Sequence, residues 1–85
     1  MRKAINPPNA PSAIGTYNQG IEINGLVFTS GQVGIDPSTG QLVGGGIDMQ
    51  TAQTLKNIEA ILSSVDIGKD SIAKLTVFVK NLDDF

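Results

Sequence analysis

The alternation of hydrophobic and polar residues early in the chain predicts a β-hairpin. Residues 20–23 and 26–29 are two short runs of β type. The Asn24-Gly25 dipeptide between them is favoured in two-residue type I′ turns, because both central positions need positive φ. One face of this hairpin is therefore expected to be apolar as far as Ser30. The turn fixes the expected cross-strand pairs, which are Ile23 with Leu26, Ile21 with Phe28, and Gln19 with Ser30.

From Met49 to Val65 the apolar period becomes helical, which predicts a helix that covers a sheet. Asp48 is the expected N-cap, and Gly68 is expected to take the left-handed position that ends the helix. The glycines at 44–46 lack the Lys-Ser/Thr of a phosphate loop, so a flexible connector is favoured over phosphate binding. The predicted apolar stripe consists of Ala52, Leu55, Ile58, Leu62 and Val65.

Strict alternation returns at residues 71–82 and predicts a strand that joins the hairpin sheet. Residues 2–5 are expected to form an edge strand, which Pro7-Pro8 terminates. The sheet face away from the helix is too apolar for bulk water, so we expect a partner subunit to cover it. That face is predicted to carry Val27, Thr29, Thr76 and Phe78.

The element order is therefore β, β, β, α, β, followed by the beginning of a second helix at Asp83-Asp84. This order predicts an α+β fold. We expect residues 1–85 to form a single domain that is incomplete, because it stops before the second helix and the last strands.

The amino-acid composition excludes several kinds of reaction and binding site, but it says less about the fold. The 85 residues contain no cysteine and no histidine, which excludes a thiolate nucleophile, a Ser-His pair and the usual nitrogen and sulfur metal ligands. A net charge of −2 and a single arginine, Arg2, argue against binding to a phosphate backbone. No apolar run reaches the roughly 20 residues of a membrane span. We therefore expect a cytoplasmic protein that binds neither nucleic acid nor membrane and holds no metal.

A hydroxyl and a glycine amide come together where the second hairpin strand ends. Ser30 closes the apolar face, and Gly31 has no Cβ, so a ligand can approach its N–H. Tyr17, the only tyrosine, lies opposite Gln32 by register and so close to the same strand end. These residues are candidate ligand contacts, and close packing of small residues at a strand end is the alternative explanation.

Several stretches together form a familiar pattern. They are Ala10-Pro11-x-Ala13-Ile14-Gly15-x-Tyr17-x-Gln19, Phe28-x-Ser30-Gly31-Gln32, Asp36-Pro37-x-Thr39-Gly40, Gln53-x-x-x-Asn57, and Thr76-Val77-Phe78 with Asp84-Phe85. In order and spacing they resemble the RidA reactive intermediate deaminase family, whose members are also called YjgF-type or L-PSP endoribonuclease-like proteins. The similarity covers the whole chain, which corresponds to the N-terminal part of a typical member.

The resemblance implies a chorismate-mutase-like α+β fold, in which helix covers one face of a mixed sheet. It also implies a homotrimer with active sites between subunits, and a small-molecule substrate. The implied reaction is hydrolysis of enamine or imine intermediates such as 2-aminoacrylate to 2-keto acids and ammonia, with no cofactor.

Matched position by position, the resemblance assigns three site residues. It places Tyr17 at the cleft rim, makes Ser30 the catalytic hydroxyl and substrate contact, and makes Gly31 the backbone amide beside the substrate. The family's substrate-binding arginine and water-orienting glutamate belong to a later segment. We therefore expect the 85 residues alone to be inactive, since one hydroxyl and one amide replace a bidentate carboxylate clamp poorly.

Two other functions stay open at this stage. A non-catalytic module for binding 2-keto acids, or for regulation by them, would use the same clefts without turnover, and retained binding without product formation would identify it. An endoribonuclease or translation inhibitor is suggested by the family's older name alone. The acidic charge balance and the absent histidine count against it, and strongly salt-dependent RNA binding would be needed to support it.

Overall fold

The Asn24-Gly25 turn forms the predicted hairpin in the computed structural model, which describes residues 2–84. Asn24 has φ 52° and Gly25 has φ 79°, as a type I′ turn requires. Strand β2 (Gly20–Ile23) pairs antiparallel with β3 (Leu26–Thr29) in the expected register. The predicted edge strand is also confirmed as β1 (Arg2–Ile5), which pairs antiparallel with β2 and completes a sheet of order β1-β2-β3.

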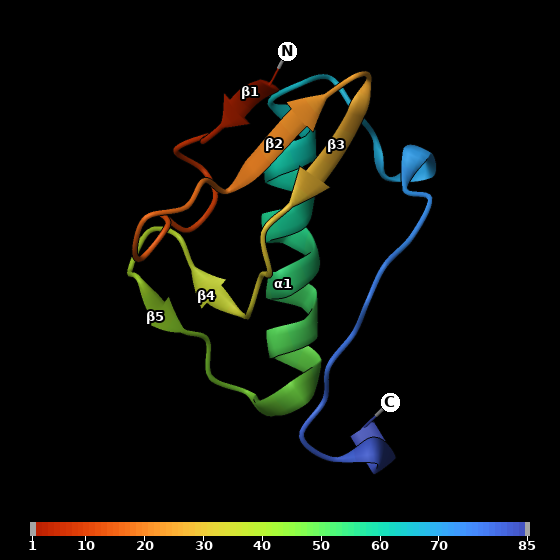
Figure 1. Cartoon of the computed structure of the whole chain (residues 1–85). Helices are drawn as coiled ribbons and strands as arrows, with labels where there is room; N and C mark the ends of the chain where they lie inside the picture. Colours follow the sequence, from red (N-terminus) through yellow and green to blue (C-terminus); the bar gives the residue numbers. More distant parts are fainter. Residues whose placement is uncertain (1, 85) are drawn as a thin grey trace.

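A single long helix, α1 (Gly46–Ser63), lies against one face of this sheet, and β2 and β3 run in front of it in Figure 1. A separate two-stranded ribbon of β4 (Ile35–Asp36) and β5 (Gln41–Leu42) lies at the lower left of the same view. All strand pairs within residues 2–84 are antiparallel. The α+β class is confirmed. No helix in this part of the chain is long and apolar enough to cross a membrane.

The two faces of the hairpin are the reverse of the prediction. Val27 packs against the buried cluster of Ile5, Ala10 and Ile61, so its side of the sheet faces α1. Gly20 lies on that side too, since a Cβ built on it would lie 3.2 Å from the Ile61 side chain. A two-residue turn decides which residues share a face, but it does not decide which face meets a helix. Here the absent side chain of Gly20 makes room for α1.

The apolar row of the hairpin consequently faces away from α1. Leu26 is 61% exposed and Phe28 is 59% exposed. Thr29 alternates with Phe28 and so lies on the α1 side with Val27. The interface predicted from Val27 and Thr29 is therefore wrong, and the uncovered apolar face belongs to the row Ile21, Ile23, Leu26 and Phe28.

Helix α1 begins and ends at residues other than the predicted ones. Its N-cap is Gly45, with φ 98°, and Asp48 lies in the first turn, where a carboxylate complements the helix dipole. At the other end Asp66 takes the left-handed conformation with φ 60°, and the Ile67 N–H donates to the Leu62 carbonyl at 3.0 Å. The helix therefore ends too early for Gly68 to serve as its terminating residue.

The buried stripe of α1 is also displaced from the predicted one. Leu62 is buried as expected, but the most buried residues beside it are Asn57 and Ile61. Leu55, a member of the predicted stripe, is 47% exposed, and Ala52 is exposed. The prediction considered apolar residues only and therefore missed Asn57. This polar residue is buried because its side chain forms hydrogen bonds within the protein.

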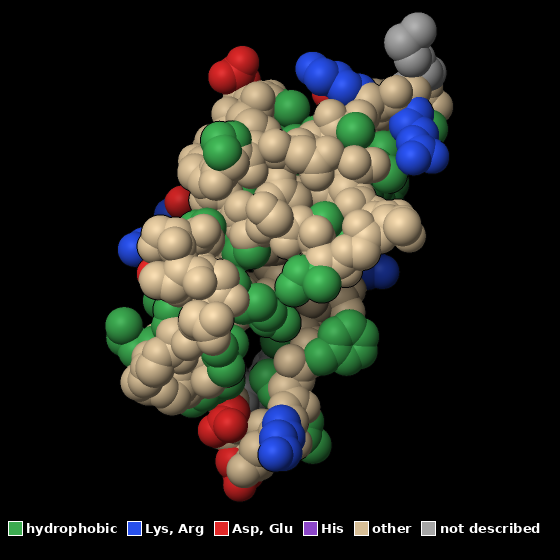
Figure 2. Space-filling view, turned by 90° about the vertical axis from the view of Figure 1, so that its left-hand side faces the viewer, with side chains coloured by type: hydrophobic (Ala, Val, Ile, Leu, Met, Phe, Trp, Pro, Cys, Tyr) green, Lys and Arg blue, Asp and Glu red, His purple; other side chains and the backbone are tan. Residues whose placement is uncertain are grey.

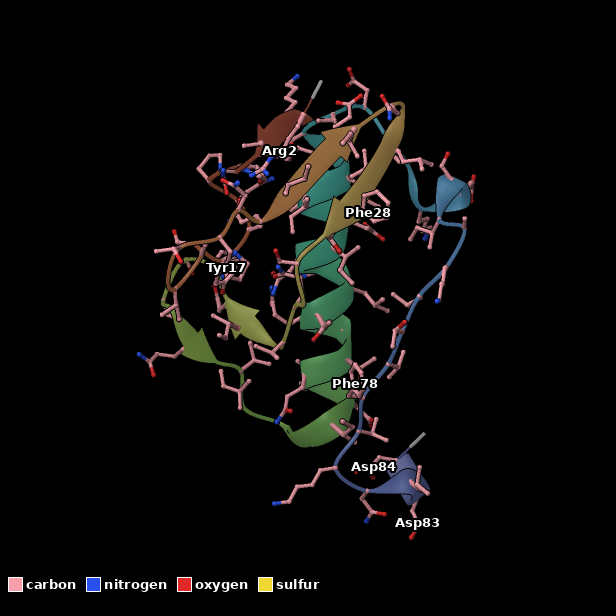
Figure 3. The ribbon with its side chains drawn as sticks, in the orientation of Figure 1. Arg2, Tyr17, Phe28, Phe78, Asp83 and Asp84 are labelled. Carbon is pink, nitrogen blue, oxygen red and sulfur yellow. The ribbon has the colours of Figure 1, made fainter. Side chains whose placement is uncertain are left out.

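The strand predicted at residues 71–82 does not form. Between the short 3-10 helices η1 (Lys69–Ser71) and η2 (Leu82–Asp84) the chain runs without regular structure beside α1 (Figure 1). A strand needs a neighbour for its N–H and C=O groups, and no described strand lies next to this segment. Leu75 and Val77 of its alternating apolar row are more than half exposed, and Phe78, from the opposite row, is 92% exposed. Figure 3 places Phe78 near the lower end of α1, away from Phe28.

The expected beginning of a second helix is present only as η2. Asn81 caps it in place of Asp83, since the Asp83 N–H donates to Asn81 Oδ1 at 3.0 Å. The turn Asp36-Pro37-Ser38-Thr39-Gly40 is confirmed between β4 and β5, with Gly40 at φ 72°.

Candidate functional site

Gln19 joins the N-terminal loop to the end of β3. Its backbone N–H donates to Asn6 Oδ1, and its carbonyl accepts the Ser30 N–H, both at 2.9 Å. Its side-chain Nε2 donates to the carbonyl oxygens of Ala10 at 3.0 Å and Pro11 at 2.5 Å. The side chain is 3% exposed, so these bonds are shielded from water. They fix the loop around residues 10–14 against the end of the hairpin.

The segment that follows β3 is fixed from the other side by α1. Asn57 Nδ2 donates to the Val33 carbonyl at 3.0 Å and the Ile35 carbonyl at 2.9 Å. Gly34 lies so close to the helix that a Cβ built on it would be 2.8 Å from Gln50 Cα. Asn57 and Gly34 therefore hold residues 31–35 at a fixed distance from the helix backbone.

A small cavity of about 60 Å³ lies between these two fixed segments. A cavity needs about 10–15 Å³ to hold one water molecule, so this one has room for a small ligand. Figure 2 faces the left-hand side of Figure 1, and its charged side chains lie at the margin while its centre is uncharged. The lining residues are Pro11, Ser12, Ala13, Ile14, Tyr17, Gln19, Gly31, Gln32, Val33 and Ile35.

Two of the predicted site residues, Tyr17 and Gly31, line this cavity together. An added Cβ on Gly31 would meet no atom within 4 Å, and the hydrogen bonds found within residues 2–84 include none from its N–H. The Tyr17 hydroxyl accepts the Ile14 N–H at 3.3 Å, which leaves its own proton for another acceptor. The cavity thus offers a backbone donor and a hydroxyl donor.

The third predicted site residue, Ser30, is held elsewhere. Its hydroxyl donates to the Asn18 carbonyl at 2.5 Å, and within the described residues it is not part of the cavity lining. Sequence reasoning missed Gln19 and Asn57, which hold the two walls. The Gln53-x-x-x-Asn57 spacing was a usable signal, because it places amide side chains one turn apart on a helix.

Charged groups lie outside the cavity lining. Arg2 lies on β1, above Tyr17 in Figure 3, and is not one of the lining residues. Asp36 begins the β4–β5 turn and accepts from the Ser38 hydroxyl at 2.6 Å and the Ser38 N–H at 2.8 Å. These bonds lower the pKa of Asp36 below its ordinary value of 3.8. Within residues 2–84 no group of three or more His, Cys, Asp or Glu side chains is placed to hold a metal ion.

Fold and cavity together define a class: an α+β domain with a small uncharged pocket at a strand end, lined by Gly31 and Tyr17. The sequence profile of the family described as Endoribonuclease L-PSP matches residues 7–85. The chain belongs to this family, which confirms the resemblance to RidA and YjgF proteins.

Relatives of known name support the assignment. The mouse protein named 2-iminobutanoate/2-iminopropanoate deaminase is 41% identical over 85 residues, which cover 100% of this chain and 63% of the mouse protein. The crystal structure of the YjgF gene product from E. coli superposes with a TM-score of 0.90 at 40% identity, covering 96% of this chain and 64% of that one. The structure of E. coli TdcF with bound serine gives a TM-score of 0.74 at 36% identity, over 79% of this chain and 52% of that one. The chain therefore spans less than two thirds of the length of these relatives.

Proposed function

We propose that the protein is a deaminase that hydrolyses small 2-imino acids, formed from enamines such as 2-aminoacrylate, to 2-keto acids and ammonia. The observation that carries the proposal is the cavity at the end of β3, with its free Gly31 amide and the Tyr17 hydroxyl. Its volume of about 60 Å³ suits a three- or four-carbon acid. The name of the mouse relative supports the same substrate class.

In this proposal the Gly31 N–H and the Tyr17 O–H donate to the substrate carboxylate, since hydrogen bonds to a charged acceptor are stronger than neutral ones. Water adds to the electrophilic C=N carbon, the C–N bond breaks, ammonia leaves, and the carbonyl of the keto acid forms. Neither cysteine nor histidine is present in the sequence, and this addition needs neither. Ser30 stays a proposed catalytic contact, although its hydroxyl here donates to Asn18.

Activity and assembly of the whole protein belong to the proposal too. The cavity lining of the described residues carries no charged side chain, so a carboxylate clamp would have to come from elsewhere, and we propose that residues 1–85 alone do not turn over substrate. We also propose a homotrimer in the cytoplasm, assembled through the uncovered row of the hairpin that includes Leu26 and Phe28.

The test extends residues 1–85 with the later segment of a family member, which supplies the carboxylate clamp, and follows keto-acid and ammonia release from freshly generated 2-aminoacrylate. Gly31→Ala places a methyl group in the cavity, and one methyl group in a binding site typically changes kcat/KM by roughly ten- to two-hundredfold. Gly68→Ala is the matched control, because its added Cβ also meets nothing within 4 Å and Gly68 lies outside the cavity lining. Equal activity of the two variants would contradict the proposed site.

A second candidate is a binding or regulatory module that holds small acids without turnover. The serine bound to TdcF favours it, since that relative binds an amino acid of suitable size. Saturable binding of 2-keto acids without ammonia release would select this function over deamination. RNA binding that weakens steeply with salt would instead point to a ribonuclease.

A further inference from the structure

The loop between β1 and β2 forms one wall of the cavity and contains no helix or strand. It extends at the left of Figure 1, and its residues 12–17 contribute Ser12, Ala13, Ile14 and Tyr17 to the lining. Within residues 2–84 the one hydrogen bond made inside this stretch runs from the Ile14 N–H to the Tyr17 hydroxyl. The first end of the stretch is held by the side chain of Gln19. The position of the wall therefore depends on how its second end is held.

Asn6 holds that second end through both polar atoms of its side-chain amide. Asn6 Oδ1 accepts the Gln19 N–H at 2.9 Å, and Asn6 Nδ2 donates to Asn18 Oδ1 at 2.7 Å. Asn18 and Gln19 directly follow Tyr17 in the chain. The backbone of Asn6 is restricted, because both of its neighbours are buried and a residue before proline favours extended conformations. The side chain of Asn6 thus connects the end of β1 to the residues beside Tyr17.

We propose that Asn6 is a positioning residue for the candidate site. It lies outside the lining of this cavity, and it acts by holding residues 18 and 19, which keeps Tyr17 at the cavity that Gly31 also lines. This inference rests on the proposed function, in which the Tyr17 hydroxyl and the Gly31 N–H bind the substrate carboxylate. When Tyr17 is already ordered, the binding of the acid does not have to immobilise its side chain, and the affinity is higher for that reason.

Tyr17 itself gives a direct readout of this role. The chain contains one tyrosine and no tryptophan, so its tyrosine fluorescence comes from Tyr17 alone. Asn6→Ala removes both bonds to residues 18 and 19, and the fluorescence anisotropy of the free protein should fall because the Tyr17 ring moves more freely. Titration with pyruvate, a stable 2-keto acid, is followed by the same fluorescence. The dissociation constant should rise about three- to tenfold, since binding now has to order one more side chain.

Two further variants separate positioning from a general loss of stability. Ser64→Ala also removes a side-chain hydrogen bond to the backbone, the one that the Ile61 carbonyl accepts, but Ser64 lies at the end of α1 and outside the cavity lining. It should leave the anisotropy and the affinity unchanged. Asn6→Asp should also stay close to wild type, because its carboxylate accepts the Gln19 N–H and the Asn18 amide can turn to donate its Nδ2.

Unchanged anisotropy or unchanged affinity in Asn6→Ala would overturn the proposal, and so would equal losses in Ser64→Ala. If Asn6→Ala did not fold, Asn18→Ala would take its place, because it removes only the bond from Asn6 Nδ2. Its losses should be smaller and in the same direction, and wild-type behaviour of Asn18→Ala would then overturn the proposal.

The outcome is separable from that of the proposed function. Failure of the wild type to bind pyruvate would overturn the proposed site and, with it, the effect of Asn6 on affinity. Binding of pyruvate with equal affinity by the wild type and Asn6→Ala would leave the proposed function intact and overturn the role of Asn6 alone.

Discussion

Asn57 offers the sharpest test of how α1 supports the candidate site. Its side chain is 1% exposed, and its Nδ2 satisfies the carbonyl oxygens of Val33 and Ile35. Its Oδ1 also accepts from Gln53 Nε2 at 2.9 Å. Asn57→Ala removes all of these bonds. The Ile35 carbonyl then loses its Asn57 donor, whereas the Val33 carbonyl keeps the bond from the Ile35 N–H at 2.8 Å.

The expected cost follows from those bonds. A hydrogen bond contributes about 0.5–1.5 kcal/mol net, and buried groups left without a partner lose more. Three lost bonds therefore predict a fall of about 2–4 kcal/mol in the free energy of unfolding. Asn57→Asp should lose a similar amount at neutral pH, because a carboxylate has no proton to donate to the two carbonyl oxygens.

Urea unfolding measures this free energy, and the same protein concentration is used for every variant so that the concentration dependence of any association is held constant. Gln53→Ala is the matched control, since it removes one partner of Asn57 and leaves both bonds to residues 33 and 35. We expect Gln53→Ala to cost below about 1.5 kcal/mol. If Asn57→Ala cost no more than Gln53→Ala, these bonds would not hold the wall of the cavity.

Three further predictions address other parts of the structure. Gly34→Ala places a Cβ 2.8 Å from Gln50 Cα, so it should destabilise the fold by about 1–3 kcal/mol in the same urea assay, and an unchanged midpoint would refute the close approach. The lowered pKa of Asp36 means that its stabilisation is present above its ordinary pKa of 3.8 and is lost as pH falls through the lowered value. Wild type should therefore lose stability relative to Asp36→Asn in that range, and parallel pH profiles would contradict this. Phe28→Ser should weaken self-association in sedimentation experiments, and an unchanged distribution would exclude the uncovered hairpin face as the interface.

The sequences of the turns correctly predicted the turns themselves and the pairing of β2 with β3. The Asn24-Gly25 turn fixed the pairing of β2 with β3, since two residues with positive φ leave one register. The turn at residues 36–40 was likewise predicted from its local sequence, and the Gly40 N–H donates to the Asp36 carbonyl. Tyr17 and Gly31 meet at one cavity, because the hairpin register brings the ends of its strands together.

Tertiary contacts determine which hairpin face is buried, which residues of α1 are buried and whether residues 71–82 form a strand. The alternation of apolar and polar residues does not determine these features. The hairpin presents its Val27 row to α1 because Gly20 makes room for Ile61, and this packing is invisible in an alternating pattern. Asn57 is buried by its bonds to residues 33 and 35 rather than by apolarity. Residues 71–82 alternate as a strand does but have no strand beside them, so their pattern produces no β-structure.

The most direct test of the candidate site is an amide NMR titration of the protein with a stable 2-keto acid such as pyruvate. The proposed function predicts saturable shifts that are largest at the Gly31 amide and that extend to Gln32 and Tyr17, the cavity residues around it. Saturable shifts centred elsewhere on the protein, or no saturable shift at Gly31, would contradict the assignment of the cavity at the end of β3 as the binding site.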